Sequence, residues 1–228
     1  MRSLFSFIAL FFLGMNVQAQ SAEDLVKQVK TKLEKVNNYK ADGKLKTNVS
    51  FLKAPIANVA IYYKKPGKLK VVNKSGISLI PKGSVNISLS NLFLSNNNYD
   101  IIDVGKDSSG LRIIKLLPKE DTAEIILATL YIDEKNSLIK RSKTTTKENG
   151  SYELEMTYGK YADWGLPDKT IFSFNTKDYK MPKGVTLDYD DGSKKKNQQE
   201  VLKNKKGKVE ISFTNYSINQ GVDESVFK

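Results

Sequence analysis

The sequence predicts a mainly β (α+β) protein, in which about eleven antiparallel strands and one N-terminal helix form a strongly curved sheet or unclosed half-barrel. Three observations favour this fold. Apolar residues repeat with a period of two along most of the chain, short turn-forming clusters separate these stretches, and only the N-terminal stretch has the helical period of 3.6. No linker rich in Pro, Gly or Ser and no internal repeat divides the chain, so residues 20–228 are expected to form one domain.

The composition excludes several classes of function. The chain has 228 residues with no cysteine and no histidine, so it has no disulfide, no Ser-His-Asp or Cys-His catalytic group, and none of the ligand sets of a typical zinc site. Any catalysis would depend on carboxylates, lysine or tyrosine. With 39% hydrophobic and 27% charged residues, the composition is that of a soluble folded protein.

Residues 1–19 are predicted to be a cleaved signal peptide. Arg2 precedes an apolar run from Leu4 to Met15, and Val17-Gln18-Ala19 has the small-x-small pattern of a cleavage site. A membrane anchor is the alternative, but the run is shorter than the roughly twenty residues that span a bilayer. No cysteine follows the run to carry a lipid, so we expect a soluble protein exported to the periplasm.

The next segment has the pattern of an amphipathic helix over residues 22–36. Ser21 and Asp24 have the spacing of a capping box at its start. Its apolar positions fall on one face and lysines occupy the other; the apolar positions are Leu25, Val26, Val29, Leu33 and Val36.

From Tyr39 the period changes to two, which predicts a long strand that continues to Phe51. Two shorter strands around residues 59–63 and 69–71 flank a turn at 64–67, whereas residues 76–95 fit a short helix and a short strand equally well. The later strands are predicted at 99–104, 111–117, 125–132, 138–144, 152–158, 169–176, 184–188 and 209–216.

A sheet of this kind has one apolar face, and a single helix is a small cover for it. The concave side is therefore either filled by side chains or left open for an apolar ligand, and the pattern alone allows both. The residues expected to form this face, and to bind acyl chains if it is open, are Val49, Phe51, Ile61, Tyr63, Leu69, Val71, Leu154 and Met156.

Positive charge is concentrated near the C-terminus. The formal net charge is +12, and residues 194–208 contain seven lysines against one glutamate. This segment is either a solvated loop whose lysines prevent aggregation or an electrostatic docking patch formed by Lys194, Lys195, Lys196, Lys205 and Lys206. For an exported protein the abundant anions are lipid head groups rather than nucleic acid.

Several short motifs, in this order, are similar to those of a known family. Residues 36–39 read Val-Asn-Asn-Tyr at the end of the predicted helix, and Ile61-Tyr-Tyr-Lys-Lys-Pro-Gly-Lys-Leu-Lys-Val71 follows the first long strand. Further motifs are Leu130-Tyr-Ile-Asp-Glu-Lys-Asn-Ser-Leu-Ile-Lys140, Gly165-Leu-Pro167 and Val222-Asp-Glu-Ser-Val-Phe227. Over residues 22–228 the chain resembles the LolA/LolB family of lipoprotein-localisation proteins.

The resemblance implies an unclosed barrel with a short helical lid that carries the acyl chains of lipoproteins from an inner-membrane donor to an outer-membrane acceptor. It implies no enzymatic activity and no cofactor. Leu25, Val29 and Leu33 would belong to the lid. Lys65 stands where the family has an arginine that latches the lid by donating to helix carbonyls, and a lysine lacks the planar donor fork of arginine.

A second departure concerns an aromatic strand. The family's Asp-Gly-x-x-x-Trp-x-Tyr strand is not recognisable, because residues 73–80 lack aromatic side chains. The expected cargo is therefore a lipoprotein or another lipid.

Two other functions remain open. An adaptor of the same fold would bind a lipid or protein in envelope signalling. An exported enzyme would need two carboxylates facing one pocket.

Overall fold

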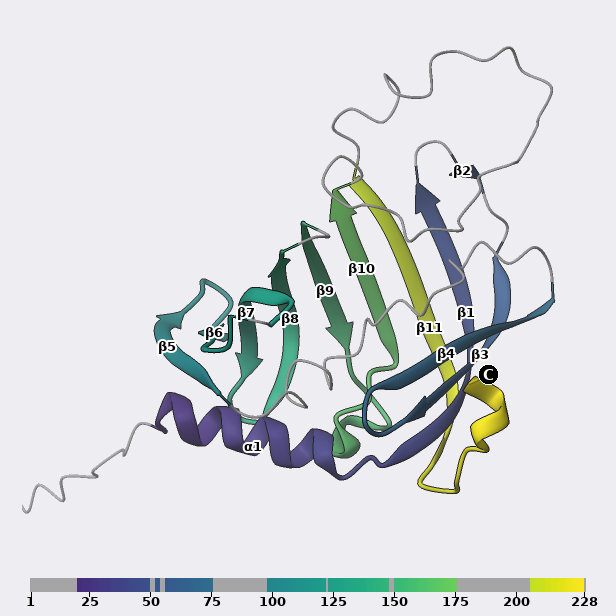
Figure 1. Ribbon diagram of the computed structural model, residues 1–228, viewed down its shortest axis with the longest axis horizontal. Helices are drawn as coiled ribbons and strands as arrows, with labels where there is room; N and C mark the ends of the chain where they lie inside the picture. The colour runs from purple at the N-terminus through teal and green to yellow at the C-terminus, as the bar shows by residue number, and fades with distance from the viewer. Residues whose placement is uncertain are drawn as a thin grey trace, which may run out of the picture.

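The structure is a computed structural model that describes residues 20–49, 52–53, 56–75, 98–121, 123–147, 150–175 and 206–227. One α-helix, α1 (Ala22–Glu34), runs along the rim of a large curved antiparallel sheet (Figure 1). The expected capping contact is confirmed, since the Asp24 amide donates to Ser21 Oγ at 3.0 Å. No helix in the described ranges is both long and apolar enough to cross a bilayer.

In the described ranges eleven strands form the sheet, which confirms the predicted fold class. They are β1 (Asn38–Val49), β2 (Leu52–Lys53), β3 (Ala57–Lys64), β4 (Lys68–Ser75), β5 (Tyr99–Lys106), β6 (Arg112–Pro118), β7 (Ile125–Asp133), β8 (Leu138–Thr146), β9 (Ser151–Thr157), β10 (Lys169–Asn175) and β11 (Lys206–Ile218). Ten of them follow the order β4-β3-β1-β11-β10-β9-β8-β7-β6-β5, and β2 pairs with β1. The ends of this order, β4 and β5, do not pair with each other, so the described sheet is an open half-barrel.

The first and last strands lie side by side in the middle of the sheet. β1 and β11 pair in antiparallel register from Tyr39 opposite Ile218 to Asn48 opposite Lys208. The other neighbours in the sheet, apart from β1 and β3 with β2 between them in the sequence, are also consecutive among the described strands of the chain. The β1 to β11 pairing therefore joins the N-terminal hairpin to the long meander of β5 to β10.

Two short 3₁₀ helices complete the described elements: η1 (Ala162–Trp164) and η2 (Glu224–Phe227). η1 lies between β9 and β10 and contacts α1, while η2 follows β11 and contacts β4.

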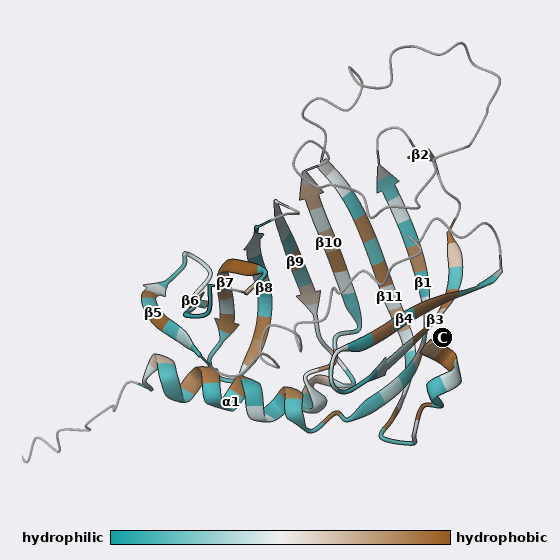
Figure 2. Cartoon of the chain, in the orientation of Figure 1, coloured by the Kyte–Doolittle hydropathy of each residue, from teal (hydrophilic) through white to brown (hydrophobic). Residues whose placement is uncertain are grey.

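The register sorts the side chains onto two faces. Odd-numbered residues of β1 and β3 point inward, and Ala41, opposite Ile61, is one such position. Figure 2 shows the resulting bands of apolar and polar residues across β10 and β11. The inner face is apolar and the outer face is polar, as period-two alternation predicts.

Two hydrophobic clusters fill the inner side. One lies where Leu25, Val26 and Val29 of α1 pack against β6 to β10, on residues such as Leu130 and Leu154. The other lies where β1, β3 and β11 curve, and it includes Ile61, Tyr63 and Tyr216. Val209 of β11 packs against both clusters.

Two boundaries differ from the prediction. α1 ends at Glu34 rather than at residue 36, because Lys35 and Val36 leave the helix through amides bonded to Lys32 and Leu33. The expected lysine loop over 194–208 is wrong at its end, where Lys206 and Lys208 belong to β11. Residues 76–95 and 184–188 and the remaining lysines of that loop lie outside the described residues.

Candidate lipid-binding face

The candidate site is the concave inner face of the sheet. Its inward positions on β1, β3 and β6 to β11 carry apolar and aromatic residues with a few hydroxyl groups; among the described residues they carry no carboxylate. The described inward positions of these strands therefore do not offer the paired carboxylates that glycoside hydrolysis requires. Within the described ranges no group of three or more acidic residues could hold a metal ion.

The structure brings the predicted acyl-binding residues that it describes onto this one face. Ile61 and Tyr63 are buried in the cluster of β1, β3 and β11, and Leu154 and Met156 are buried in the cluster beneath α1. Leu69 and Val71 are partly buried at the edge on β4. Val49 ends β1, but its side chain and all of Phe51 lie outside the described part of the chain.

The apolar side of α1 covers one end of this face. Leu25, Val26 and Val29 are at most 3% exposed, and Leu33 is partly buried against the same cluster. Full burial of a leucine or valine side chain is worth about 1.5–3 kcal/mol relative to exposure in water. The side chains of these three helix residues thus fill a space that would otherwise be open to solvent or to a ligand.

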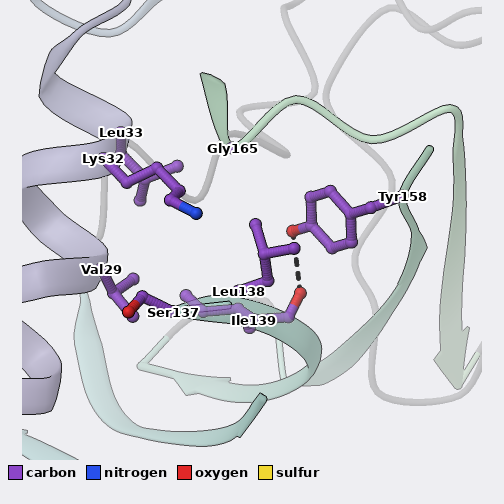
Figure 3. A pocket seen from close by; sticks show the side chains of 8 residues that line it. All are labelled: Val29, Lys32, Leu33, Ser137, Leu138, Ile139, Tyr158 and Gly165. Atoms are coloured by element: carbon purple, nitrogen blue, oxygen red, sulfur yellow. Dashed lines mark hydrogen bonds between the residues drawn. The ribbon is translucent and has the colours of Figure 1, made fainter. Parts of the chain in front are cut away.

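A small cleft remains between α1 and the sheet. Figure 3 shows it between Val29, Lys32 and Leu33 of the helix, Ile139 of β8, and Tyr158 directly after β9. It has room for about one water molecule, far less than an acyl chain needs. In this conformation the inner face is therefore closed at α1, and a chain can enter there only if the helix moves.

Lys65 joins the end of α1 to the turn between β3 and β4. Its ammonium group donates to the carbonyl oxygen of Glu34 at 2.6 Å and to Asn37 Oδ1 at 3.4 Å. The Lys65 amide also donates to the carbonyl oxygen of Asn37 at 2.9 Å. A cation at the C-terminus of a helix is favourable, because the last carbonyl groups have no partner within the helix.

The turn between β7 and β8 holds the middle of the helix. The ammonium group of Lys32 donates to the carbonyl oxygen of Asn136, and Ser137 Oγ donates to Gln28 Oε1 at 2.9 Å. These contacts are polar and lie at the surface, so they can open without leaving a buried group unpaired.

Asn219 is a further anchor, which the sequence analysis missed. Its Oδ1 accepts from the Asn37 amide at 2.8 Å, and its Nδ2 donates to the carbonyl oxygen of Lys35 at 2.9 Å. Its own amide donates to the carbonyl oxygen of Asn38 at 2.8 Å. Asparagine tolerates its positive φ of 57° better than most residues, which is the sequence signal that could have found it.

An aromatic group lines the inner face of β9 and β10 and was also missed. The ring of Phe172 lies 5.4 Å from that of Tyr152 and 5.2 Å from that of Phe174. Gly207 on β11 makes room for it, because a Cβ there would lie 2.4 Å from the Phe174 ring. The alternation of Thr170, Phe172 and Phe174 was the available signal, since it places both rings on one face.

Buried tyrosines add hydroxyl groups to this apolar interior. Burial raises the pKa of Tyr39, Tyr158 and Tyr216 above the ordinary value of tyrosine, so their hydroxyls stay protonated. Tyr216 donates to the carbonyl oxygen of Pro167 and Tyr158 to that of Ile139, each at 2.8 Å. They act as neutral hydrogen-bonding groups of the interior.

Comparison with solved structures places this architecture among known folds. A candidate outer membrane lipoprotein-sorting protein domain from Vibrio parahaemolyticus superposes with a TM-score of 0.54 at 10% identity, over 91% of this chain and 97% of that one. A DUF1329 family protein from Desulfovibrio piger gives a TM-score of 0.53 at 13% identity, over 91% and 95% of the two chains. The chain has a LolA-like fold.

A LolA superfamily protein from Nitrosomonas europaea is also similar, with a TM-score of 0.48 at 7% identity over 89% of this chain and 96% of that chain. No protein-family model and no curated protein matches the sequence. The fold of this chain is therefore apparent from comparison of structures and not from overall sequence identity.

Proposed function

We propose that the protein is a periplasmic carrier that binds the acyl chains of a lipoprotein or another lipid on its concave apolar face and transfers them toward the outer membrane. Residues 1–19 would direct export and be removed, and residues 20–228 would form the single carrier domain. The protein would act without enzymatic chemistry and without a cofactor. An inner-membrane donor would load it and an outer-membrane acceptor would unload it.

One observation carries this proposal: in the described part of the chain, an apolar inner face is covered at one end by α1, which surface polar contacts hold in place. The buried residues of this face need a replacement cover when the helix moves. Acyl chains supply one, because they are as apolar as the side chains of α1 that they would displace.

The energetics explain why a carrier is needed. Burial of one CH₂ group is worth about 0.8 kcal/mol, so a chain of about fourteen methylenes resists entry into water by roughly 11 kcal/mol. A molecule with two or three such chains does not cross an aqueous compartment unaided at a useful rate. When the cargo leaves, α1 packs back onto the apolar face and buries it again. This packing offsets part of the free energy of cargo release and so favours delivery.

Lys65 would serve as the latch of the lid. It offers point-charge donation to one helix carbonyl, whereas an arginine there would present a fork of several donors. We infer that the lid opens at lower cost than with arginine, which suits a cargo that is loaded and released without a strong input of energy.

The direct test is to purify the protein from its own periplasm and to analyse it by native mass spectrometry and lipid extraction. Acylated molecules bound in stoichiometric amount support the carrier. A protein that arrives free of lipid, and that takes up no fluorescent fatty acid or lysophospholipid when these are added, would rule the carrier out.

A tether tests the route of entry. The chain has no cysteine, so Gln28→Cys and Ser137→Cys introduce the only two thiols, at positions whose side chains are in contact. Bridging them with a reducible cross-linker should abolish lipid uptake, and reduction should restore it. The matched controls place one cysteine at Lys27 or one at Lys135, which are both exposed; each should accept a single label without loss of uptake.

A further inference from the structure

The outer face of the N-terminal half of the sheet is strongly basic. At the outward positions of β1, β3, β4 and β11 the described side chains include eight lysines and two carboxylates. The lysines are Lys40, Lys44, Lys46, Lys64, Lys68, Lys70, Lys74 and Lys208, and the carboxylates are Asp42 and Glu210. We call this surface the basic face.

The carboxylates near the basic face are already neutralised. Asp42 pairs with Lys74 at 2.5 Å, and Glu210 pairs with Lys169 of β10 at 2.9 Å. Glu224 of η2 binds both Lys64 and Lys68, at 2.8 and 2.6 Å. Lys40, Lys44, Lys46 and Lys208 form no ion pair with any carboxylate in the described ranges and are exposed, so their charges are directed at solvent.

Pairing across the strands brings these lysines together around an apolar centre. Lys40 lies opposite Tyr62, and Tyr62 lies opposite Lys70. The ammonium group of Lys40 is 5.9 Å from the centre of the Tyr62 ring. In the next row Val72 is 38% exposed. An aromatic ring and an aliphatic side chain set among lysines is the side-chain pattern of a surface that rests on lipid head groups.

The other half of the outer face lacks this excess of charge. The outward positions of β6, β8 and β9 carry Lys115, Arg141 and Lys143 against Glu153 and Glu155. Arg141 forms an ion pair with Glu153, with Nε 3.6 Å from Oε1, and stacks on Tyr131. The positive field therefore belongs to one side of the molecule and is not a general property of its surface.

We propose that the basic face is a docking surface for an anionic membrane, through the phosphate groups of its lipids. Lysines provide point charges that match phosphates without a fixed geometry, and each lysine near an anionic membrane surface contributes about 1 kcal/mol to binding. The basic face lies on the convex side, opposite the apolar face that would hold the cargo. Docking through it leaves the concave side and α1 free to exchange a lipid.

This inference does not depend on the identity of the cargo, and it differs from the predicted docking of Lys194, Lys195 and Lys196, which lie outside the described residues. Lys206 and Lys208 lie at the start of β11, directly after that segment in the sequence.

The test compares matched charge variants in vesicle co-sedimentation. The variant Lys40→Gln/Lys44→Gln/Lys46→Gln removes three charges from the basic face, and Lys115→Gln/Lys135→Gln/Lys143→Gln removes three from the other half. With vesicles of 70% phosphatidylcholine and 30% phosphatidylglycerol at low salt, the first variant should bind about a hundredfold more weakly than the unchanged protein, at a factor of about five for each lysine. The second should bind within about threefold of it, and 0.5 M salt should abolish binding in all cases.

Several results would overturn the proposal. Equal loss in both triple variants would mean that only net charge matters. If vesicle binding disappears when only Lys194, Lys195, Lys196, Lys203 and Lys205 are changed to glutamine, docking belongs to that segment. Equal binding to pure phosphatidylcholine vesicles, or tighter binding to duplex DNA, would exclude an anionic membrane as the partner. Uptake of a fluorescent fatty acid, measured on the same variants, separates this proposal from the carrier function, because it should not change.

Discussion

A few individual side chains set the geometry at the junction of α1, β1 and β11. Asn219 makes hydrogen bonds with both its side chain and its backbone to residues 35, 37 and 38 at the end of the helix and the start of β1. It holds the last turn of the helix to the strand that follows. The sequence offered only a weak signal for this role, because asparagines are frequent in the chain and its partners lie about 180 positions away.

We expect Asn219→Ala to destabilise the protein by roughly 1–3 kcal/mol, because it removes the side-chain hydrogen bonds and places a Cβ without a polar group at a positive φ. Asn219→Gly keeps the backbone conformation without strain and should cost less. Urea unfolding followed by circular dichroism measures both values. If Asn219→Gly lowered the free energy of unfolding as much as Asn219→Ala or more, the positive φ at this position would not contribute to stability.

Gly207 offers a second test at the residue scale. Gly207→Ala should destabilise the fold by about 1–3 kcal/mol, because its Cβ would meet the Phe174 ring. Adding Phe174→Leu should recover part of that loss, so that the two changes are not additive. If the unfolding free energies of the two single variants simply sum in the double variant, the proposed contact between these residues does not limit the packing.

At the scale of elements, the sequence predicted the strands well where the period-two pattern was unbroken. β7 and β9 match their predicted ranges closely, since one face of each is buried and the other is wet. The start of β11 was assigned to a loop because lysines and a glycine are typical of loops. The glycine is there because an aromatic ring from β10 occupies the place of its side chain, which is a tertiary cause that no local pattern reveals.

The hold of the β3 to β4 turn on α1 gives a third prediction. Lys65→Met should lower the hydrogen-exchange protection of the last turn of α1 and speed up lipid uptake, because a helix carbonyl loses its charged donor. Lys65→Arg should preserve protection or increase it. Lys27→Met, on the exposed side of α1, serves as the control and should change neither quantity. Unchanged protection in Lys65→Met would exclude a latch at this position.

The contact of η2 with the hairpin of β3 and β4 is sensitive to acid. Glu224 of η2 accepts hydrogen bonds from the side chains of Lys64 and Lys68. These bonds hold the pKa of Glu224 at about 2, below the ordinary value of 4.5. A carboxylate whose pKa is lower in the folded state stabilises that state at pH values above its pKa in the unfolded chain. This stabilisation is lost as the pH falls toward 2. Thermal unfolding should therefore show Glu224→Gln less stable than the unchanged protein at pH 7, with the difference shrinking below about pH 4.5. A difference that stays constant from pH 7 to pH 3 would contradict the ion pairs.

At the scale of the whole molecule, the half-barrel was predictable and the order of its strands was not. The count of short strands and the single helix were enough to favour an open curved sheet. The pairing of β1 with β11 had no local signal, because it depends on which long strands can cover the apolar face together. For the same reason the sequence placed Leu154 and Ile61 on one face but could not tell that they belong to two clusters, which meet at Val209.

The single tryptophan allows the motion of the whole molecule to be followed. Trp164 is 37% exposed in η1, which contacts α1, and the neighbouring Gly165 lies against Leu33. Adding lysophospholipid should shift its fluorescence emission as α1 leaves the sheet, and the cross-linked Gln28→Cys/Ser137→Cys protein should show no shift. Lipid uptake without any change in emission would mean that the cargo enters elsewhere.

The central position of β11 has a consequence for how the chain reaches its native state. The strand that joins the two halves of the sheet is the last one along the chain, and its partner β1 is the first, with about 180 residues between Tyr39 and Ile218. Contacts between such distant positions slow folding, because a long loop must close before they form. Until β11 arrives, β1 and β10 each present a bare edge. The sheet is therefore expected to remain incomplete and prone to aggregation until almost all of the chain can take part in folding.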